Sequence, residues 1–125
     1  MYSSQLLDHF QNPRRAGDLD DADAVAEIEN PVCGDVIRLG LRVVDGKVVD
    51  ARFKAKGCVP AIACGSALTE LIVGKTLVDA FGLNRDEVAA AVGGVPQASS
   101  HAAQLAVDVL AAALKKIESK SALRP

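Results

Sequence analysis

The residues of this chain that are best suited to chemistry are three cysteines, an aspartate and a histidine. Cys33 lies in the segment NPVCGD, and Cys58 and Cys64 lie six positions apart in GCVPAIACGS. Asp35 follows Cys33 by two positions, and His101 lies far downstream in SHAAQLA. Thiolates, a carboxylate and an imidazole are ligands of zinc or iron in tetrahedral sites. Because these segments are distant in the sequence, only the fold can assemble such a site.

Two runs of alternating residues predict the β-hairpin that would bring the cysteines together. Apolar positions alternate with largely polar ones over 36–43 and again over 48–55, and Asp45-Gly46 lies between the runs. This pattern is typical of an antiparallel hairpin with one buried face. Cys33 and Cys58 would lie at the same end of adjacent strands, which are about 4.8 Å apart. Asp35 would point to the same face as Cys33.

The sequence allows two registers for this hairpin. A two-residue turn at Asp45-Gly46 sets Leu39 against Arg52 and mixes the apolar and polar faces. A three-residue loop with Gly46 as a bulge sets Leu39 against Ala51 and keeps the faces separate. We prefer the second register. In both of them the two cysteines at the strand ends are neighbours.

The other elements are mostly helical. Expected are a first helix capped by Ser3 or Ser4 and stopped by Asn12-Pro13, a short strand over 25–29, a helix from Pro60 to Gly74, short helices over 75–81 and 84–92, and a long helix from Ser99 or Ser100 to about Ile117. The chain is therefore predicted to be an α+β protein, with a three-stranded antiparallel sheet and helices packed on one face. We expect one domain over 1–125, with a flexible tail over 119–125.

Composition excludes several classes of function. The net charge is −2, and the chain has three Phe, one Tyr and no Trp, which provides neither a basic surface nor a stacking platform for nucleic acid. The N-terminus does not resemble a signal peptide, and no apolar run is long enough to span a membrane. We therefore expect a cytoplasmic protein that binds neither nucleic acid nor membranes. In that reducing compartment, three cysteines favour ligation or thiol chemistry over disulfides.

Each remaining candidate residue has an alternative structural explanation. His101 is the fourth candidate ligand, although an ordinary position at a helix start explains it equally well. A helix N-terminus beside thiolates would lower their pKa. His9 is expected to be an exposed or half-buried helix residue. Cys64 falls on the core-facing arc of its helix, so we interpret it as a packing residue. A compensating metal ligand is the less favoured role for it, and a disulfide with Cys58 the least favoured.

Four motifs together resemble a known family. NPVCGD, KGC followed by Thr69-Glu70, SHAAQLA before a long helix, and the opening YSSQLLDHFQNPRRAG are similar to the U-type iron–sulfur scaffold family, which includes IscU and the N-terminal domain of NifU. The resemblance covers nearly the whole chain. It implies a non-catalytic scaffold on which a cysteine desulfurase delivers sulfur to iron. The resulting [2Fe-2S] cluster is then passed to acceptor apo-proteins. By position, Cys33, Asp35, Cys58 and His101 match the family's ligands.

The chain departs from this family at two places. The family's histidine is followed by a cysteine, which is replaced here by Ala102. The family's LPPVK loop, which contacts a chaperone pair, is reduced to Val95-Pro96, with Ser99 at the lysine position. A chaperone pair is therefore the weakest expectation among the partners. The chain also lacks the insertion typical of the SufU branch.

Three functions remain open from the sequence. The first is a scaffold or carrier that binds iron or a [2Fe-2S] cluster through Cys33, Asp35, Cys58 and His101. The second is a zinc-binding module that docks onto or regulates a cysteine desulfurase without building clusters. The third is sulfur transfer with a persulfide on Cys58 or Cys64, which requires an exposed thiol of low pKa.

Overall fold

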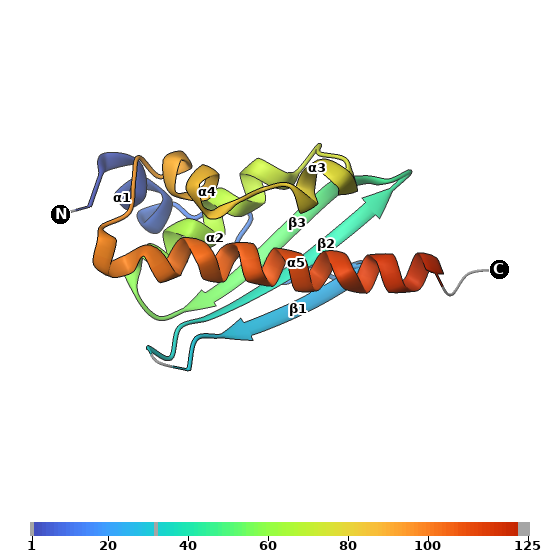
Figure 1. The fold of residues 1–125 in the computed structure, drawn as a ribbon, viewed down its shortest axis with the longest axis horizontal. Coiled ribbons are helices and arrows are strands. Elements are labelled where there is room, and N and C mark those ends of the chain that lie inside the picture. The colour runs from blue at the N-terminus through green and yellow to red at the C-terminus, as the bar shows by residue number, and fades with distance from the viewer. Residues whose placement is uncertain (1, 32, 123–125) are drawn as a thin grey trace.

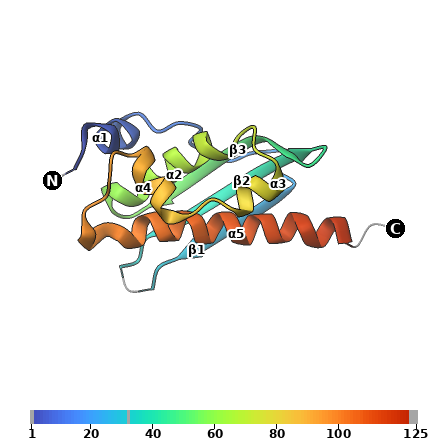
Figure 2. The same ribbon diagram turned by 45° about the horizontal axis from the view of Figure 1, so that its top comes forward.

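A three-stranded antiparallel sheet in the order β1-β2-β3 carries the helices on one face, as Figures 1 and 2 show. The computed structural model describes residues 2–31 and 33–122. Its elements are α1 (Ser4–Gln11), β1 (Ala24–Glu29), β2 (Val36–Val44), β3 (Lys47–Lys56), α2 (Val59–Ile72), α3 (Leu77–Phe81), α4 (Arg85–Ala91), the 3-10 turn η1 (Gln97–Ser99) and α5 (Ser100–Ala122). The predicted α+β class is confirmed.

The hairpin between β2 and β3 has the two-residue turn at Asp45-Gly46, so the register that we preferred is wrong. Both turn residues have positive φ (53° and 77°), as a type I′ turn requires. Next to the turn, a bulge leaves Val49 without a strand partner and shifts the register so that Leu39 pairs with Phe53. The bulge restores the separation of apolar and polar faces, whose loss was our reason to reject this turn.

The core lies between the sheet and the helices α2 and α5. Side chains of all three strands contribute to it, with Ile37, Leu39 and Leu41 of β2 fully buried. In α2 the small residue Gly65 faces the ring of Phe53, and a Cβ atom there would lie 2.7 Å from the ring carbon Cδ2. Glycine at this position therefore allows α2 to pack closely on β3, and the packing fixes where the N-terminus of α2 lies.

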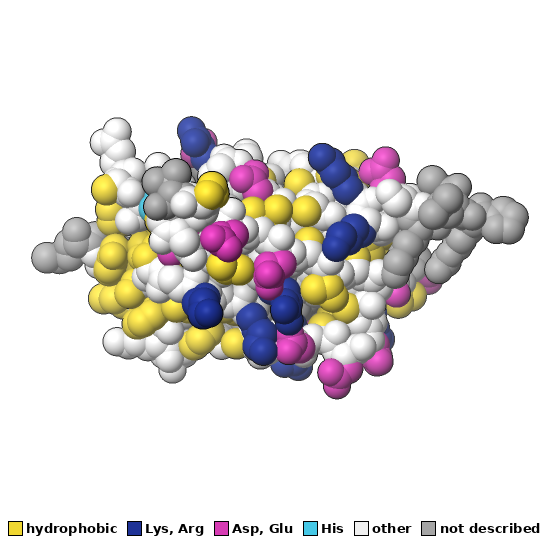
Figure 3. Space-filling view, turned by 90° about the horizontal axis from the view of Figure 1, so that it is seen from below, with side chains coloured by type: hydrophobic (Ala, Val, Ile, Leu, Met, Phe, Trp, Pro, Cys, Tyr) yellow, Lys and Arg dark blue, Asp and Glu magenta, His cyan; other side chains and the backbone are white. Residues whose placement is uncertain are grey.

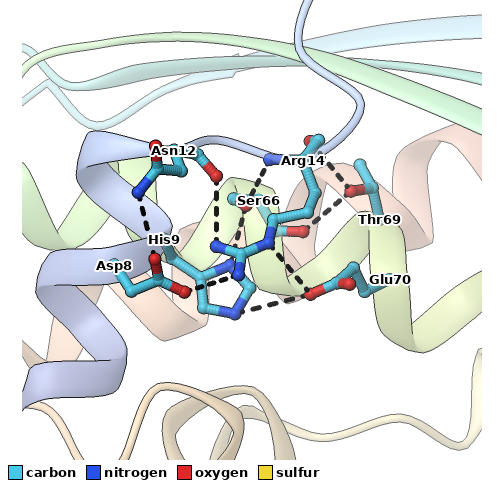
Figure 4. Close-up of polar contacts among 7 residues, drawn as sticks. All are labelled: Asp8, His9, Asn12, Arg14, Ser66, Thr69 and Glu70. Carbon is cyan, nitrogen blue, oxygen red and sulfur yellow. Dashed lines mark hydrogen bonds and ion pairs between the residues drawn. The ribbon is translucent and has the colours of Figure 1, made fainter.

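Helix α1 is attached to α2 by a polar cluster, drawn in Figure 4, in which His9, Ser66 and Thr69 are buried. His9 is only 8% exposed, so the expectation of an exposed or half-buried residue is wrong. Its Nδ1 lies 2.8 Å from Oγ of Ser66, which also accepts a hydrogen bond of 2.8 Å from the backbone N–H of Arg14. The hydroxyl of Ser66 can therefore donate its own proton to Nδ1 of His9. The other ring nitrogen, Nε2, lies 3.5 Å from Oε1 of Glu70.

Helix α5 is longer than the sequence predicted. We expected it to end near Ile117 and a tail to occupy 119–125, but the helix continues to Ala122. No glycine or proline interrupts KKIESKSA, so local propensity allows the continuation. Positions 123–125 lie outside the described residues. Among the described helices, none combines the length and the hydropathy that a membrane crossing requires.

The buried histidine makes stability depend on pH. Burial lowers the pKa of His9 below 6.5, and Arg14 acts in the same direction, whereas Glu70 and Asp8 oppose it. Below pH 6.5 the unfolded chain therefore binds a proton that the folded chain does not. The contribution of His9 to the free energy of unfolding is complete above that pH and is lost as the pH falls through the lowered pKa. Urea unfolding at a series of pH values measures how the free energy of unfolding declines as the pH falls.

The matched control is His9→Asn, which retains a hydrogen-bonding group beside Ser66 but does not titrate in this range. We expect its free energy of unfolding to fall less steeply with decreasing pH than that of the native chain. Equal slopes in the two proteins would show that His9 does not cause the dependence.

Candidate metal centre

The carboxylate of Asp35 is the centre of the candidate site. It is 3% exposed and directly precedes the strand β2. Its Oδ1 accepts a hydrogen bond of 3.0 Å from the backbone N–H of Cys58, and its Oδ2 accepts one of 3.1 Å from the thiol of Cys58. Oδ2 also lies 3.3 Å from Nε2 of His101. One buried carboxylate therefore joins the starts of β2, α2 and α5.

Cys33 approaches this carboxylate from the connection between β1 and β2. The connection is closed by two backbone hydrogen bonds, from Asn30 N–H to the carbonyl of Asp35 and from Gly34 N–H to the carbonyl of Asn30. Gly34 has φ +77°, a conformation that glycine adopts at little cost. Ligand atoms of Cys33, Asp35 and His101 lie within 4.8 Å of one another. A backbone loop thus presents the thiol of Cys33 beside the buried carboxylate.

The structure brings together all four residues that the sequence singled out as ligands. Cys33 is exposed, Cys58 is half-buried, and the side chain of His101 is 34% exposed. The cluster therefore opens to solvent at Cys33 and His101 and is closed at Asp35. Sulfur, nitrogen and oxygen atoms in this arrangement are suited to a borderline-soft metal ion.

Gly57 is a residue of the site that the sequence analysis did not single out. Its φ is +132°, and a Cβ atom there would lie 2.0 Å from Oδ1 of Asp35. The carboxylate can reach the N–H of Cys58 only because residue 57 has no side chain. The glycine before Cys58 is visible in the sequence, but its contact with Asp35 depends on the pairing of β2 with β3.

Electrostatics at the site favour a negative carboxylate at Asp35 and a neutral thiol at Cys58. Burial alone would raise the pKa of Asp35, but hydrogen bonds from Cys58, Cys33 and His101 outweigh it and lower that pKa. Burial raises the pKa of the Cys58 thiol to about 11, and the neighbouring charge of Asp35 adds to the effect. We expected a helix N-terminus to lower the pKa of the thiols, but for Cys58 the effect of burial is larger. Without a metal, this thiol stays protonated and donates to Asp35.

Cys64 lies in the core, as the helical arc predicted. Its exposed fraction is 0%, and burial raises the pKa of its thiol to about 12. A buried, protonated thiol is a poor nucleophile, which disfavours a persulfide on Cys64. Ala102, which follows His101, also has an exposed fraction of 0% and offers no ligand atom. The described thiols that reach the site are therefore those of Cys33 and Cys58.

A side chain at residue 57 should displace the carboxylate of Asp35. We expect Gly57→Ala to lower the free energy of unfolding by about 1–3 kcal/mol, because of the clash and the positive φ. It should also weaken binding of cobalt(II), which can be followed by visible absorption. The control is Gly34→Ala, which has positive φ but meets no atom within 4 Å. Equal cobalt affinities in the two variants would show that the contact between Gly57 and Asp35 does not matter for metal binding.

Removing the buried thiol should affect stability and leave the site intact. Cys64→Ala should lower the free energy of unfolding by about 1 kcal/mol, because it removes one buried sulfur atom from the core. We expect the metal content of the purified variant, measured by elemental analysis, to equal that of the native chain. Loss of metal in this variant would contradict the assignment of Cys64 to packing.

The sequence was compared with those of known families and proteins. The pattern of the family described as NifU-like N terminal domain matches residues 1–123. The chain belongs to this family. The resemblance seen in the motifs is thereby confirmed over almost its entire length.

Members of this NifU-like family with assigned functions are similar to the chain. An iron-sulfur cluster assembly scaffold protein IscU 1 of Archaeoglobus fulgidus is 45% identical over 114 residues, which cover 91% of this chain and 74% of the relative. A scaffold protein IscU of Haemophilus influenzae is 36% identical, with 95% and 97% covered. The crystal structure of a nitrogen-fixing NifU-like protein (N-terminal) from Brucella abortus has a TM-score of 0.77 at 25% identity and covers 94% of both chains.

Proposed function

We propose that this NifU-like domain is a scaffold or carrier that binds iron or a [2Fe-2S] cluster at Cys33, Asp35, Cys58 and His101 and transfers it to apo-proteins. The observation that carries the proposal is the convergence of Cys33, Cys58 and His101 on the buried carboxylate of Asp35. The names of the relatives, which are cluster assembly scaffolds, support the same role. The domain has a binding role in this proposal and no catalytic one.

The donor set is compatible with iron. Two thiolates, one imidazole nitrogen and one carboxylate oxygen would supply four ligands, and iron–sulfur centres tolerate exchange of thiolate for nitrogen ligands. Each thiol must lose its proton on binding, so metal competes with the hydrogen bond from Cys58 to Asp35. Partial solvent exposure at Cys33 and His101 leaves a route for delivery and release. These properties are suited to a cluster that is held temporarily.

The surface around the site supports docking of partner proteins. In Figure 3 hydrophobic side chains gather at the left end, where Figure 1 places the connections from β1 to β2 and from β3 to α2, whereas acidic and basic side chains occupy the middle. Pro31 is exposed in the first of these connections, and Val59 and Ile62, in the first turn of α2 after the second, are half-buried. Apolar surface with few charges is typical of the core of a protein interface. We infer that a cysteine desulfurase and acceptor apo-proteins dock here.

A second candidate function is a zinc-binding module that docks onto a cysteine desulfurase without building clusters. The replacement of a possible thiol ligand by Ala102 favours it, because the four remaining groups complete the tetrahedral shell of a single zinc ion. The two functions require the same four residues and differ in whether sulfide is bound.

Metal and acid-labile sulfide analysis distinguishes the two functions. The protein is purified without oxygen and analysed, with a visible spectrum, before and after iron and a sulfur source are supplied. We expect equal amounts of iron and sulfide with cluster absorbance, and we expect both Cys33→Ala and Cys58→Ala to abolish them while the far-ultraviolet circular dichroism is unchanged. The control is Cys64→Ala, whose sulfur lies in the core. About one zinc per chain without sulfide would support the second function, and unchanged binding in both site variants would contradict the ligand assignment.

A further inference from the structure

The outer face of the sheet, which the helices in Figures 1 and 2 leave uncovered, carries a group of basic side chains. Successive residues of a strand point to opposite faces, so the exposed residues between the buried ones point outward. On β2 and β3 these include five basic residues: Arg38, Arg42, Arg52, Lys54 and Lys56. Composition did not predict such a surface, because the whole chain has a net charge of −2. Four of the five lie toward the strand ends that carry Asp35 and Cys58, and we call them the basic stripe: Arg38, Arg52, Lys54 and Lys56.

The middle of the basic stripe already binds a carboxylate of this chain. Arg38 lies directly opposite Lys54 across the two strands, an arrangement in which like charges repel. The carboxylate of Asp18, in the loop before β1, lies 3.3 Å from Nη1 of Arg38 and 3.1 Å from Nζ of Lys54. Leu19 of the same loop packs over Gly40, where a Cβ atom would lie 3.3 Å from its own Cβ. An acidic segment therefore fits against this face of the sheet.

The two ends of the basic stripe have no such carboxylate. Arg52 and Lys56 lie two positions before and after Lys54 on β3, and within residues 2–31 and 33–122 neither makes an ion pair or a side-chain hydrogen bond. Besides Asp18, only Glu27 of β1 pairs with the stripe, 3.2 Å from Nε of Arg38. Four cations against these two carboxylates leave an excess of positive charge. Alternate residues of a strand are about 6.7 Å apart, a spacing that an extended acidic segment reproduces.

The surroundings of the basic stripe resemble a protein interface more than a surface for nucleic acid. A shallow hollow of about 300 Å³ contains Lys56 together with the half-buried apolar residues Val36 and Ala55. Val25 of β1 points to the same face and is 43% exposed. Apolar groups beside charged ones are typical of protein interfaces, in which arginine is also enriched. None of the residues that line this hollow is aromatic, so it offers no platform on which bases could stack.

The position of the stripe relates it to the candidate metal centre. Lys56 lies opposite Val36, which follows Asp35, and it precedes Gly57 and Cys58 in the chain. A protein that binds along β3 would therefore lie beside the candidate ligands without replacing any of them. Complementary charges of this kind orient a partner and accelerate its association.

We propose that the basic stripe docks an extended acidic segment of a partner protein, whose carboxylates pair with Arg52 and Lys56. A guanidinium group can bind a carboxylate through two N–H groups, and an ammonium group binds it as a point charge. The interaction needs no metal, because the stripe contains no candidate ligand. It is therefore independent of whether the domain holds iron, a cluster or zinc.

The probe for this surface is a fluorescein-labelled peptide in which glutamate alternates with threonine. Its binding is followed by fluorescence anisotropy at low ionic strength, where charges are least screened. We expect the double variant Arg52→Gln/Lys56→Gln to bind the peptide about fivefold more weakly than the native chain. The matched control is Arg85→Gln/Lys115→Gln, which removes the same charge from exposed positions on α4 and α5 and should bind like the native chain. Equal weakening in both variants would overturn the proposal, because only net charge would then matter.

Removing the carboxylate that occupies the stripe should have the opposite effect. Asp18→Asn frees Arg38 and Lys54, so we expect it to bind the same peptide about threefold more tightly. The control is Asp86→Asn, which makes the same change of charge at an exposed position on α4 and should leave the affinity unchanged. Tighter binding in both variants to the same extent would contradict a specific role of the stripe.

The class of partner and the location of binding are tested in the native chain. A single-stranded oligothymidylate and vesicles that contain phosphatidylserine replace the peptide at equal concentrations of negative charge. Tighter binding of either one than of the peptide would overturn the assignment to a protein partner. In two-dimensional NMR we expect the peptide to shift signals of β2 and β3, and shifts confined to the helices would also contradict the proposal.

Metal and sulfide content of Arg52→Gln/Lys56→Gln separates this inference from the proposed function. We expect both contents to equal those of the native chain, because neither residue is a candidate ligand. If the native chain forms its cluster but does not bind the peptide, the docking inference fails and the proposed function stands. If it binds the peptide at the stripe but forms no cluster, the docking inference stands and the proposed function fails.

Discussion

The hydrogen bonds to the carboxylate of Asp35 are the interaction on which the candidate site depends. Oδ1 accepts from the backbone N–H of Cys58, whereas Oδ2 accepts from the thiol of Cys58 and also contacts Nε2 of His101. A buried carboxylate is costly unless such donors surround it, so the segments that carry Asp35, Cys58 and His101 are held together. The absence of a side chain at Gly57 makes this approach possible. Geometry of the site and local stability are therefore governed by the same few atoms.

The rest of the fold positions the elements that meet at this carboxylate. Gly65 allows α2 to pack against Phe53 of β3, and the N-terminus of α2 then presents Cys58. On its other side α2 holds α1 through the buried pair of His9 and Ser66. The described chain contains no buried side-chain nitrogen or oxygen atom without a hydrogen-bond partner. The buried polar groups beneath the site are thus satisfied, whereas Cys33 lies on the exposed connection between β1 and β2.

The surroundings of the site differ from those of a closed structural metal centre, because Cys33 is exposed and the side chain of His101 is 34% exposed. A structural zinc site is normally complete and enclosed by its own ligands. An open site is better suited to the exchange of a bound metal than an enclosed one, as the proposed scaffold role requires. Membership of the NifU-like family points in the same direction.

The sequence by itself determined the class of fold, the order of the elements and the four residues that meet at the site. Alternation across Asp45-Gly46 was sufficient to place Cys33 and Cys58 at one end of a hairpin, because side chains in strands alternate with a period of two. Family motifs added His101, which periodicity left undecided. These conclusions depend on local patterns and on neighbours in the sequence.

The tertiary structure alone decided the register, the burial of His9 and the role of Gly57. The alternation required that one face of β3 be buried, but it did not specify that a two-residue turn and a bulge at Val49 would together achieve this against the helices. His9 is buried because Ser66, 57 positions away, supplies its hydrogen-bond partner. Each of these features arises from contacts between segments distant in the sequence, whose geometry exists only once the core has packed.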